Sequence, residues 1–163
     1  MKPQRALQAE TGVKVTVVDK AEQAKRIHAA IAQRAYELFE SHGRQCGHEL
    51  EDWEEARAAT LGALDFGLTL RDHEMLLGAD VADFAPDSLF VWAAPGRLTL
   101  CGRPLANRMP AATDRDGEHM IFREIPVRAA FNPYGVKAKL RGRFLEIMLP
   151  LAGWAEQVRA VAA

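Results

Sequence analysis

Three residues in the first third of the chain carry side chains that often bind zinc. His42, Cys46 and His48 follow the pattern H-x3-C-x-H, and Glu49 could supply a further ligand. Zinc prefers imidazole nitrogen and thiolate sulfur, usually with four ligands in a tetrahedron. No fourth histidine or cysteine follows at ligand spacing, so we interpret these residues as a solvated turn and predict no metal site.

The other residues that could do chemistry lack a catalytic arrangement. Glu51, Glu54 and Glu55 form an acidic cluster, which we interpret as the solvated face of a helix. Ser41, Ser88 and the 5 histidines show no nucleophile elbow and no catalytic spacing. A phosphate-binding glycine loop and a Walker lysine are also missing. We therefore predict no enzyme activity, no catalytic residue and no cofactor.

Composition narrows the class of protein further. The 163 residues are 48% hydrophobic and carry a formal net charge of −1, without a basic stripe that would favour nucleic acid. The chain holds no apolar run long enough for a membrane span, and residues 1–5 lack a signal core. Cys46 and Cys101 make no disulfide framework. We expect a cytoplasmic protein with two unpaired thiols and no nucleic-acid or membrane partner.

The residues around the possible zinc ligands form a helical hairpin by pattern. Asp19 offers an N-cap with Glu22 as its capping-box partner, which predicts a helix over about 20–41. Gly43 suits the left-handed position that ends a helix. A second helix is predicted over about 49–61. Each helix has one apolar face, so the two helices are predicted to form an antiparallel hairpin that must dock on another element. The apolar faces consist of Ile27, Ile31, Ala35 and Leu38 in the first helix and Leu50, Trp53 and Ala56 in the second.

After Asp65 the apolar period changes to two, which indicates strands. A short edge strand is also predicted over 13–17. Glycine, proline and aspartate separate the later strands, and residues 102–119 read as a long loop. Seven or eight short strands with regular turns favour an antiparallel β-sandwich. The predicted strand regions are 68–70, 75–81, 89–93, 98–100, 122–126, 136–140 and 143–150.

Residues of about 65–150 resemble the α-crystallin domain, the core of small heat shock proteins. Four short motifs carry the resemblance in the family's order: Gly96-Arg97-Leu98-Thr99-Leu100-Cys101-Gly102-Arg103, Ile125-Pro126, Val136-Lys137-Ala138 and Leu145-Glu146-Ile147-Met148-Leu149-Pro150. The resemblance implies an immunoglobulin-like sandwich and a role in holding unfolded proteins. In the family, an I-x-I tail element fills a groove on a neighbouring subunit, and the tail Trp154–Ala163 has no such element.

Residues of about 27–58 resemble a short bacterial domain of unknown function that is found ahead of α-crystallin-like domains. This resemblance implies no activity. The matching residues are Arg34-Ala35-Tyr36-Glu37-Leu38-Phe39-Glu40, Gly43-Arg44, Gly47 to Trp53, and Ala56.

The family resemblance also implies a partner groove between the strand at 89–93 and the strand at 136–140. Leu89, Val91 and Ala93 should face the core, so that Phe90 and Trp92 point outward. The residues expected to line the client-binding or partner-binding groove are Phe90, Trp92, Val136, Ala138 and Leu140. We hypothesise that the hairpin packs on or near the two aromatic residues, as ordinary core or as a displaceable lid, through Ile31, Leu38 and Trp53.

These patterns predict a mainly β protein with an immunoglobulin-like antiparallel sandwich, preceded by a helical hairpin. We expect residues 1–62 to form a tail, a short strand and the hairpin, 63–152 the sandwich, and 153–163 a short tail. The predicted function is ATP-independent holding of unfolded client proteins by a homo-oligomer, most simply a dimer. The alternative is a protein-interaction or scaffold module that keeps the sandwich without holding clients.

Overall fold

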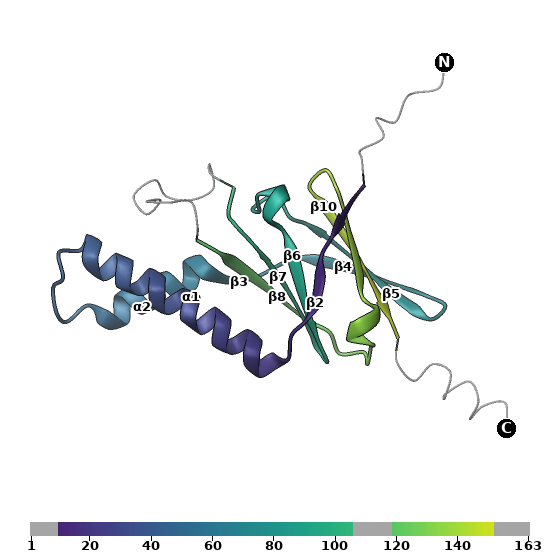
Figure 1. Cartoon of the computed structure of the whole chain (residues 1–163), viewed down its shortest axis with the longest axis horizontal. Helices are drawn as coiled ribbons and strands as arrows, with labels where there is room; N and C mark the ends of the chain where they lie inside the picture. Colours follow the sequence, from purple (N-terminus) through teal and green to yellow (C-terminus); the bar gives the residue numbers. More distant parts are fainter. Residues whose placement is uncertain (1–9, 106–118, 152–163) are drawn as a thin grey trace, which may run out of the picture.

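The computed structural model of the chain describes residues 10–105 and 119–151 (Figure 1). These residues form two helices and two five-stranded sheets. The helices are α1 (Lys20–Ser41) and α2 (Glu49–Thr60). The first sheet contains, in spatial order, β1 (Thr11–Val13), β9 (Lys137–Arg141), β10 (Phe144–Pro150), β5 (Glu74–Asp80) and β4 (Phe66–Arg71). The second sheet contains β2 (Val15–Val17), β6 (Phe90–Ala94), β7 (Arg97–Gly102), β8 (Ile121–Pro126) and β3 (Leu61–Ala63).

The predicted mainly β sandwich with an N-terminal helical hairpin is confirmed. The first sheet is antiparallel throughout. The second sheet is antiparallel only in its centre, because β2 and β3 pair with β6 and β8 in parallel. The expected seven or eight strands were therefore too few. The single edge strand expected over 13–17 is two strands, β1 and β2, and β3 was not predicted. Each of the three spans only three residues, which is too short for the sequence pattern to separate them.

Alternating side chains fill the space between the sheets. On β10, Leu145, Ile147 and Leu149 are fully buried, and Gly142 turns the chain before them with a φ of 60°. A side chain would be strained in that left-handed conformation, which is why glycine occupies it. The interior faces of β6 and β7 contribute to the same apolar cluster, which also includes Leu89, Val91, Ala93, Leu98 and Leu100.

Helix α1 begins and ends where its sequence signals place it. Asp19 accepts a hydrogen bond from the backbone N–H of Glu22 at 2.9 Å, and Gly43 has a φ of 77°. The predicted helix bounds are confirmed for α1, whereas α2 ends one residue earlier than expected, at Thr60. Neither of the described helices is long and apolar enough to cross a bilayer.

The predicted apolar face of α2 is partly wrong. Leu50 is 73% exposed, while Asp52, Ala56 and Thr60 form the buried stripe that faces the rest of the protein. Small side chains at Ala56 and Thr60 let the helix approach its neighbours closely, and Asp52 is carried inward by the same i, i+4 spacing. Asp52 is thus buried on the inner face of α2, whereas the sequence pattern predicted Leu50 on that face.

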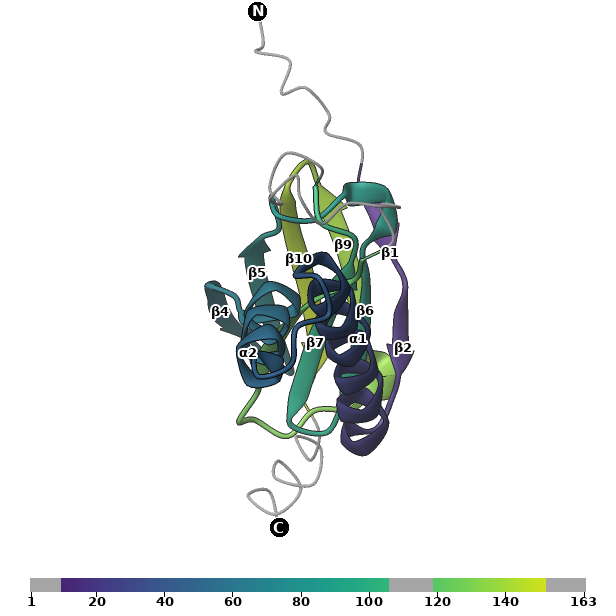
Figure 2. The ribbon, with the colours of Figure 1, turned by 90° about the vertical axis from the view of Figure 1, so that its left-hand side faces the viewer.

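The hairpin lies against the outer face of the second sheet (Figure 2). Its contact residues form a second apolar cluster, separate from the sandwich interior. The turn between the helices projects away from the sheets (Figure 1). The cluster consists of Val18, Ile27, Ile31, Leu38, Ala56, Trp92, Cys101 and Phe122.

Candidate functional site

The N-terminal segment of residues 11–17 connects the edges of the two sheets. Strand β1 pairs with β9 in the first sheet, with Val13 opposite Ala138. Two residues later, β2 pairs with β6 in the second sheet, with Val15 opposite Val91. Val13 and Val15 are half-buried and pack against the sandwich interior. The furrow between these two sheet edges is therefore filled by residues of the same chain.

The structure places the five expected groove residues on two different sides of the second sheet. Val136, Ala138 and Leu140 belong to the sandwich interior and are buried. Trp92 is buried in the second cluster under the hairpin, and Phe90 is half-buried at its margin. The interior residues of the expected groove and its two aromatic residues therefore lie on opposite sides of strand β6.

The aromatic residues of the second sheet pack against one another beneath the hairpin. The Trp92 and Phe122 rings are stacked with centroids 5.4 Å apart, and the Phe90 ring lies 6.0 Å from Trp92. The Arg26 guanidinium carbon lies 5.4 Å from the Trp92 ring, within the range of a cation–π contact.

The three expected packing residues of the hairpin differ in burial. Ile31 and Leu38 are buried in the same cluster as Trp92. Trp53 is only partly buried there, and its ring lies 4.9 Å from that of His28.

The edge strand β4 carries two largely exposed apolar side chains. Leu68 and Leu70 are 52% and 71% exposed. Their register partners are Leu77 and Met75, which are buried in the interior, so the two leucines lie on the interior-facing side of the first sheet. The first sheet therefore extends beyond the second at this edge. The sequence pattern of Leu68 and Leu70 predicts a strand, but not its place at an edge.

The two serines of the chain serve the local backbone. Ser41 Oγ donates to the carbonyl of Leu38 at 2.9 Å, and Ser88 Oγ donates to the carbonyl of Ala85 at 2.7 Å. Ser88 Oγ also accepts the backbone N–H of Arg103 at 2.9 Å. These hydroxyls close turns, and their bonds give no sign of a nucleophile paired with a base.

The two cysteines lie in opposite environments. Cys46 is exposed in the hairpin turn, whereas Cys101 is buried on β7, and both are free thiols. Burial raises the pKa of the Cys101 thiol far above its ordinary value, with smaller opposing effects from a backbone hydrogen bond of Trp92 and from the charge of Arg26. Cys101 is therefore a neutral, inert core residue.

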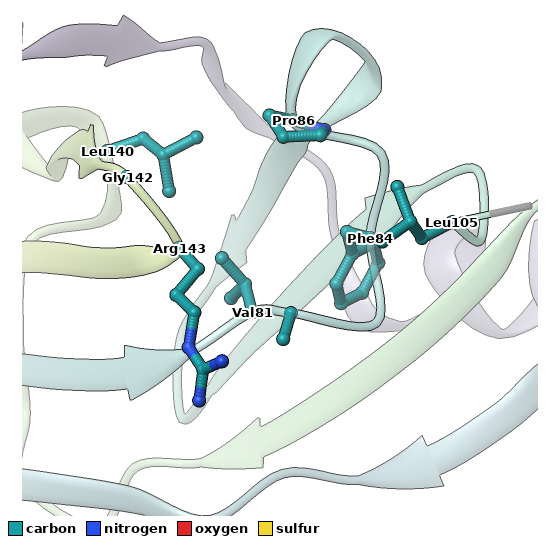
Figure 3. A pocket seen from close by; sticks show the side chains of 8 residues that line it. Val81, Phe84, Pro86, Leu105, Leu140, Gly142 and Arg143 are labelled. Carbon is teal, nitrogen blue, oxygen red and sulfur yellow. The ribbon is translucent and has the colours of Figure 1, made fainter. Parts of the chain in front are cut away.

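A small cavity of about 230 Å³ lies where the segment after β5 meets the turn between β9 and β10 (Figure 3). Its walls are mostly apolar, and Arg143 contributes the charged side chain. Small-molecule sites usually measure about 300–1,000 Å³ and have several converging polar groups. This cavity has neither property. It is lined by Val81, Ala82, Phe84, Pro86, Leu105, Leu140, Gly142 and Arg143.

The possible zinc ligands of the hairpin turn do not converge on one point. His48 Nδ1 lies 3.2 Å from a carboxylate oxygen of Glu51, and Cys46 is exposed. His42 instead faces α2, where its Nδ1 lies 2.9 Å from Asp52 Oδ1. Sequence spacing alone missed Asp52, because a charged residue is expected on the solvent side of a helix.

Comparison with known families supports the hairpin as a recognisable unit. Residues 28–60 match the family described as "Protein of unknown function (DUF2934)". This match covers α2 and most of α1 and brings no activity with it. No curated protein matches the chain in sequence.

Several solved small heat shock proteins are similar in fold. The hspA of Xanthomonas axonopodis is 19% identical, with 56% of this chain and 95% of that chain covered and a TM-score of 0.44. Heat shock protein 16.0 of Schizosaccharomyces pombe is 14% identical, with 56% and 75% covered and a TM-score of 0.43. A small heat-shock protein of Xylella fastidiosa is 17% identical, with 55% and 86% covered and a TM-score of 0.41. At these identities the likeness concerns the fold alone.

Proposed function

We propose that this protein holds unfolding polypeptides without using a nucleotide, and that strand β4 provides a principal binding surface. The observation that supports the proposal is the exposed edge with Leu68 and Leu70 on it. An edge strand offers backbone N–H and C=O groups to an extended segment, and the two leucines offer apolar surface beside them. Unfolding proteins expose both complements, namely unpaired strands and apolar side chains.

The furrow between β6 and β9 is the second proposed binding surface. Residues 11–17 occupy it with two short strands of three residues each. Such short pairings contribute few hydrogen bonds, so a client strand with larger apolar side chains could replace them. In this proposal, clients reach Val136, Ala138 and Leu140 only after the N-terminal segment leaves. They reach Trp92, and the buried side of Phe90, only where the hairpin is also displaced from the outer face of the second sheet.

Holding of this kind needs only affinity for the unfolded state. A protein that binds unfolded chains shifts their equilibrium by mass action and prevents their association with one another. We propose a homo-oligomer as the working form, because the same β4 edge that accepts a client can also accept a second copy of the chain. The protein is not proposed to act as an enzyme.

The alternative is a scaffold module that binds one folded partner and holds no clients. The observation that favours it is the closure of the expected groove by the chain's own residues, together with the burial of Trp92 under the hairpin. A scaffold needs a stable surface, and both the closed furrow and the packed hairpin provide one.

Aggregation of a heated test protein distinguishes the two functions. We expect the full chain to suppress light scattering at near-stoichiometric amounts, and the double variant Leu68→Ser, Leu70→Ser to lose most of this effect. Leu50→Ser is the matched control, because Leu50 is as exposed as Leu70 but lies on α2. A wild-type chain that is folded and gives no suppression would favour the scaffold. Equal suppression by the double variant would exclude β4 as the binding surface.

A further inference from the structure

Three potential metal ligands meet near the closed end of the hairpin. His42 caps the C-terminus of α1, while Asp52 and Glu55 lie three residues apart on α2. One ligand atom from each of these side chains lies within 4.8 Å of the other two. Residues three apart on a helix share a face, so both carboxylates can approach the same imidazole.

The Asp52 carboxylate is the unusual member of this group. Its side chain is only 4% exposed, and its Oδ1 is 2.9 Å from His42 Nδ1. Its Oδ2 is buried and makes no hydrogen bond with the described residues. A buried polar atom without a partner costs about 1–3 kcal/mol, and more when it is charged. Buried charges in proteins are normally paired or coordinate a metal, so Oδ2 offers a ligand atom in addition to the contact that Oδ1 makes with His42.

We propose that His42, Asp52 and Glu55 bind a divalent first-row metal ion, for which Zn²⁺ is the appropriate probe. One imidazole nitrogen and two carboxylate oxygens form a ligand set that suits such ions. Metal bonds of 2.0–2.2 Å in a tetrahedron bring ligand atoms to about 3.5 Å from one another. Glu55 is exposed and the His42 side chain is 49% exposed, so both can move by the small distance required.

The proton balance at His42 follows from its contacts. Its Nδ1 presents a lone pair to the metal when the ring carries its proton on Nε2. A neutral ring that donates Nδ1–H to Asp52 before the metal binds must move that proton to Nε2. A doubly protonated ring already carries a proton on Nε2 and releases the Nδ1 proton to solvent. The fourth position of a tetrahedral ion would be taken by water.

Nearby charges limit the affinity without preventing binding. The Arg34 guanidinium interacts electrostatically with Glu55 and Glu37, and burial lowers its pKa more than these carboxylates raise it. The Asp52 and Glu55 carboxylates with the Arg34 guanidinium carry a net charge of −1 before the metal arrives, and Glu37 adds a further negative charge beside Arg34. The metal would connect the end of α1 to α2 and so stabilise the hairpin.

Titration of the full chain with Zn²⁺ alone, monitored by calorimetry and by competition with a chromogenic chelator, tests the proposal. We expect one ion per chain, and at least a tenfold loss of affinity in both His42→Gln and Glu55→Gln. The matched controls are His48→Gln and Cys46→Ser, which change the neighbouring turn and should bind as the wild type does. Zn²⁺ should raise the thermal midpoint of the wild type and of both controls, but not of the two ligand variants.

Three results would overturn the proposal. The first is the absence of stoichiometric binding by the folded wild type. The second is unchanged affinity in both His42→Gln and Glu55→Gln. The third is loss of binding in Cys46→Ser and His48→Gln with retention in Glu55→Gln, which would place the ion at the turn. Because Glu55 is exposed, Glu55→Gln should fold normally even where a change at Asp52 would not.

Discussion

Thr99 donates a hydrogen bond from its Oγ1 to Gln23 Oε1 at 2.7 Å, and this bond joins α1 to strand β7 across 76 positions of sequence. Both side chains are fully buried. Gln23 Nε2 donates in turn to the carbonyl of Val18 at 2.7 Å, so the amide is used at both ends. The hairpin is thus attached to the second sheet by a satisfied polar network as well as by apolar contacts, which orients it uniquely.

Breaking this network on either side leaves a buried polar partner unsatisfied, so the two substitutions should not be additive. Thr99→Val and Gln23→Met each leave a buried partner unsatisfied, and we expect each to lower the free energy of unfolding by about 1–3 kcal/mol. The double variant should lose less unfolding free energy than the sum of the two single variants. In each single variant the remaining polar group of the pair faces an apolar side chain, whereas the double variant contains neither polar group. Urea denaturation of the four proteins gives the coupling energy.

Thr69→Val is the matched control for this cycle. Thr69 is exposed on β4, and its replacement should change stability by less than about 0.5 kcal/mol. Strictly additive effects of the Thr99 and Gln23 substitutions would mean that the bond contributes nothing beyond the separate side chains.

The buried Cys101 thiol makes stability depend on alkaline pH. Burial raises its pKa in the folded protein, whereas the unfolded thiol titrates near its ordinary value of about 8.5. Above that pH the unfolded state has lost the proton that the folded state keeps. The folded state then binds more protons, so its stability is full below about pH 8.5 and falls by up to about 1.4 kcal/mol per pH unit above it.

Comparison of the wild type with Cys101→Ala isolates this effect from other groups that titrate at high pH. The difference in unfolding free energy between the two should shrink as the pH rises above about 8.5. In the native protein, a thiol reagent should modify Cys46 quickly and Cys101 only after unfolding. Rapid modification of both thiols in the native state would show that the second cluster opens easily.

How far the sequence predicts this structure depends on the length of each signal. Helix α1 combines a cap, a long apolar stripe and a terminal glycine, and its bounds follow from them. Strands β1, β2 and β3 have three residues each, and their pairing is decided by which sheet edge they meet. Strands β2 and β3 lie at opposite edges of the second sheet, and the helical hairpin connects them. The parallel pairing of β3 with β8 therefore depends on where the hairpin returns the chain, and no local sequence pattern predicts that position.

The candidate sites show the same limit. The sequence marks His42 as a possible ligand, but its pattern predicts that Glu55 is a solvated charge, and it gives no signal for Asp52. Their convergence depends on how α2 rotates against α1, and that rotation follows from the small residues Ala56 and Thr60. The exposure of Leu68 and Leu70 likewise depends on the second sheet ending before β4.

Close packing at Gly102 predicts a sharp effect of one added methyl group. A Cβ at Gly102 would lie 2.8 Å from Phe84 Cδ1 and 3.2 Å from Ser88 Oγ, and Phe84 is almost completely buried. We expect Gly102→Ala to lower the free energy of unfolding by about 1–3 kcal/mol through overpacking. Gly67→Ala is the control, since nothing lies within 4 Å of a Cβ there, and it should be neutral or slightly stabilising.

Release of the N-terminal segment is the remaining prediction. Val15 packs against the interior, so Val15→Asp should detach residues 11–17 from both sheet edges. The Val91 N–H donates to the carbonyl of Lys14 at 2.9 Å, and the Val18 N–H donates to that of Ala93 at 3.0 Å. Hydrogen exchange of these two amides should therefore accelerate in the variant, and binding of an apolar dye should rise.

Thr16→Asp introduces the same charge at the neighbouring, exposed position of β2 and should leave both amides protected. Because β6 also pairs with β7, amides in that pairing should remain slow in Val15→Asp and report that the sandwich is intact. If clients use the furrow, Val15→Asp should suppress aggregation better than the wild type does, because residues 11–17 no longer have to leave the furrow before a client binds. Unchanged exchange at Val91, or dye binding that matches that of Thr16→Asp, would show that the segment is a permanent part of the sandwich and that clients must bind elsewhere.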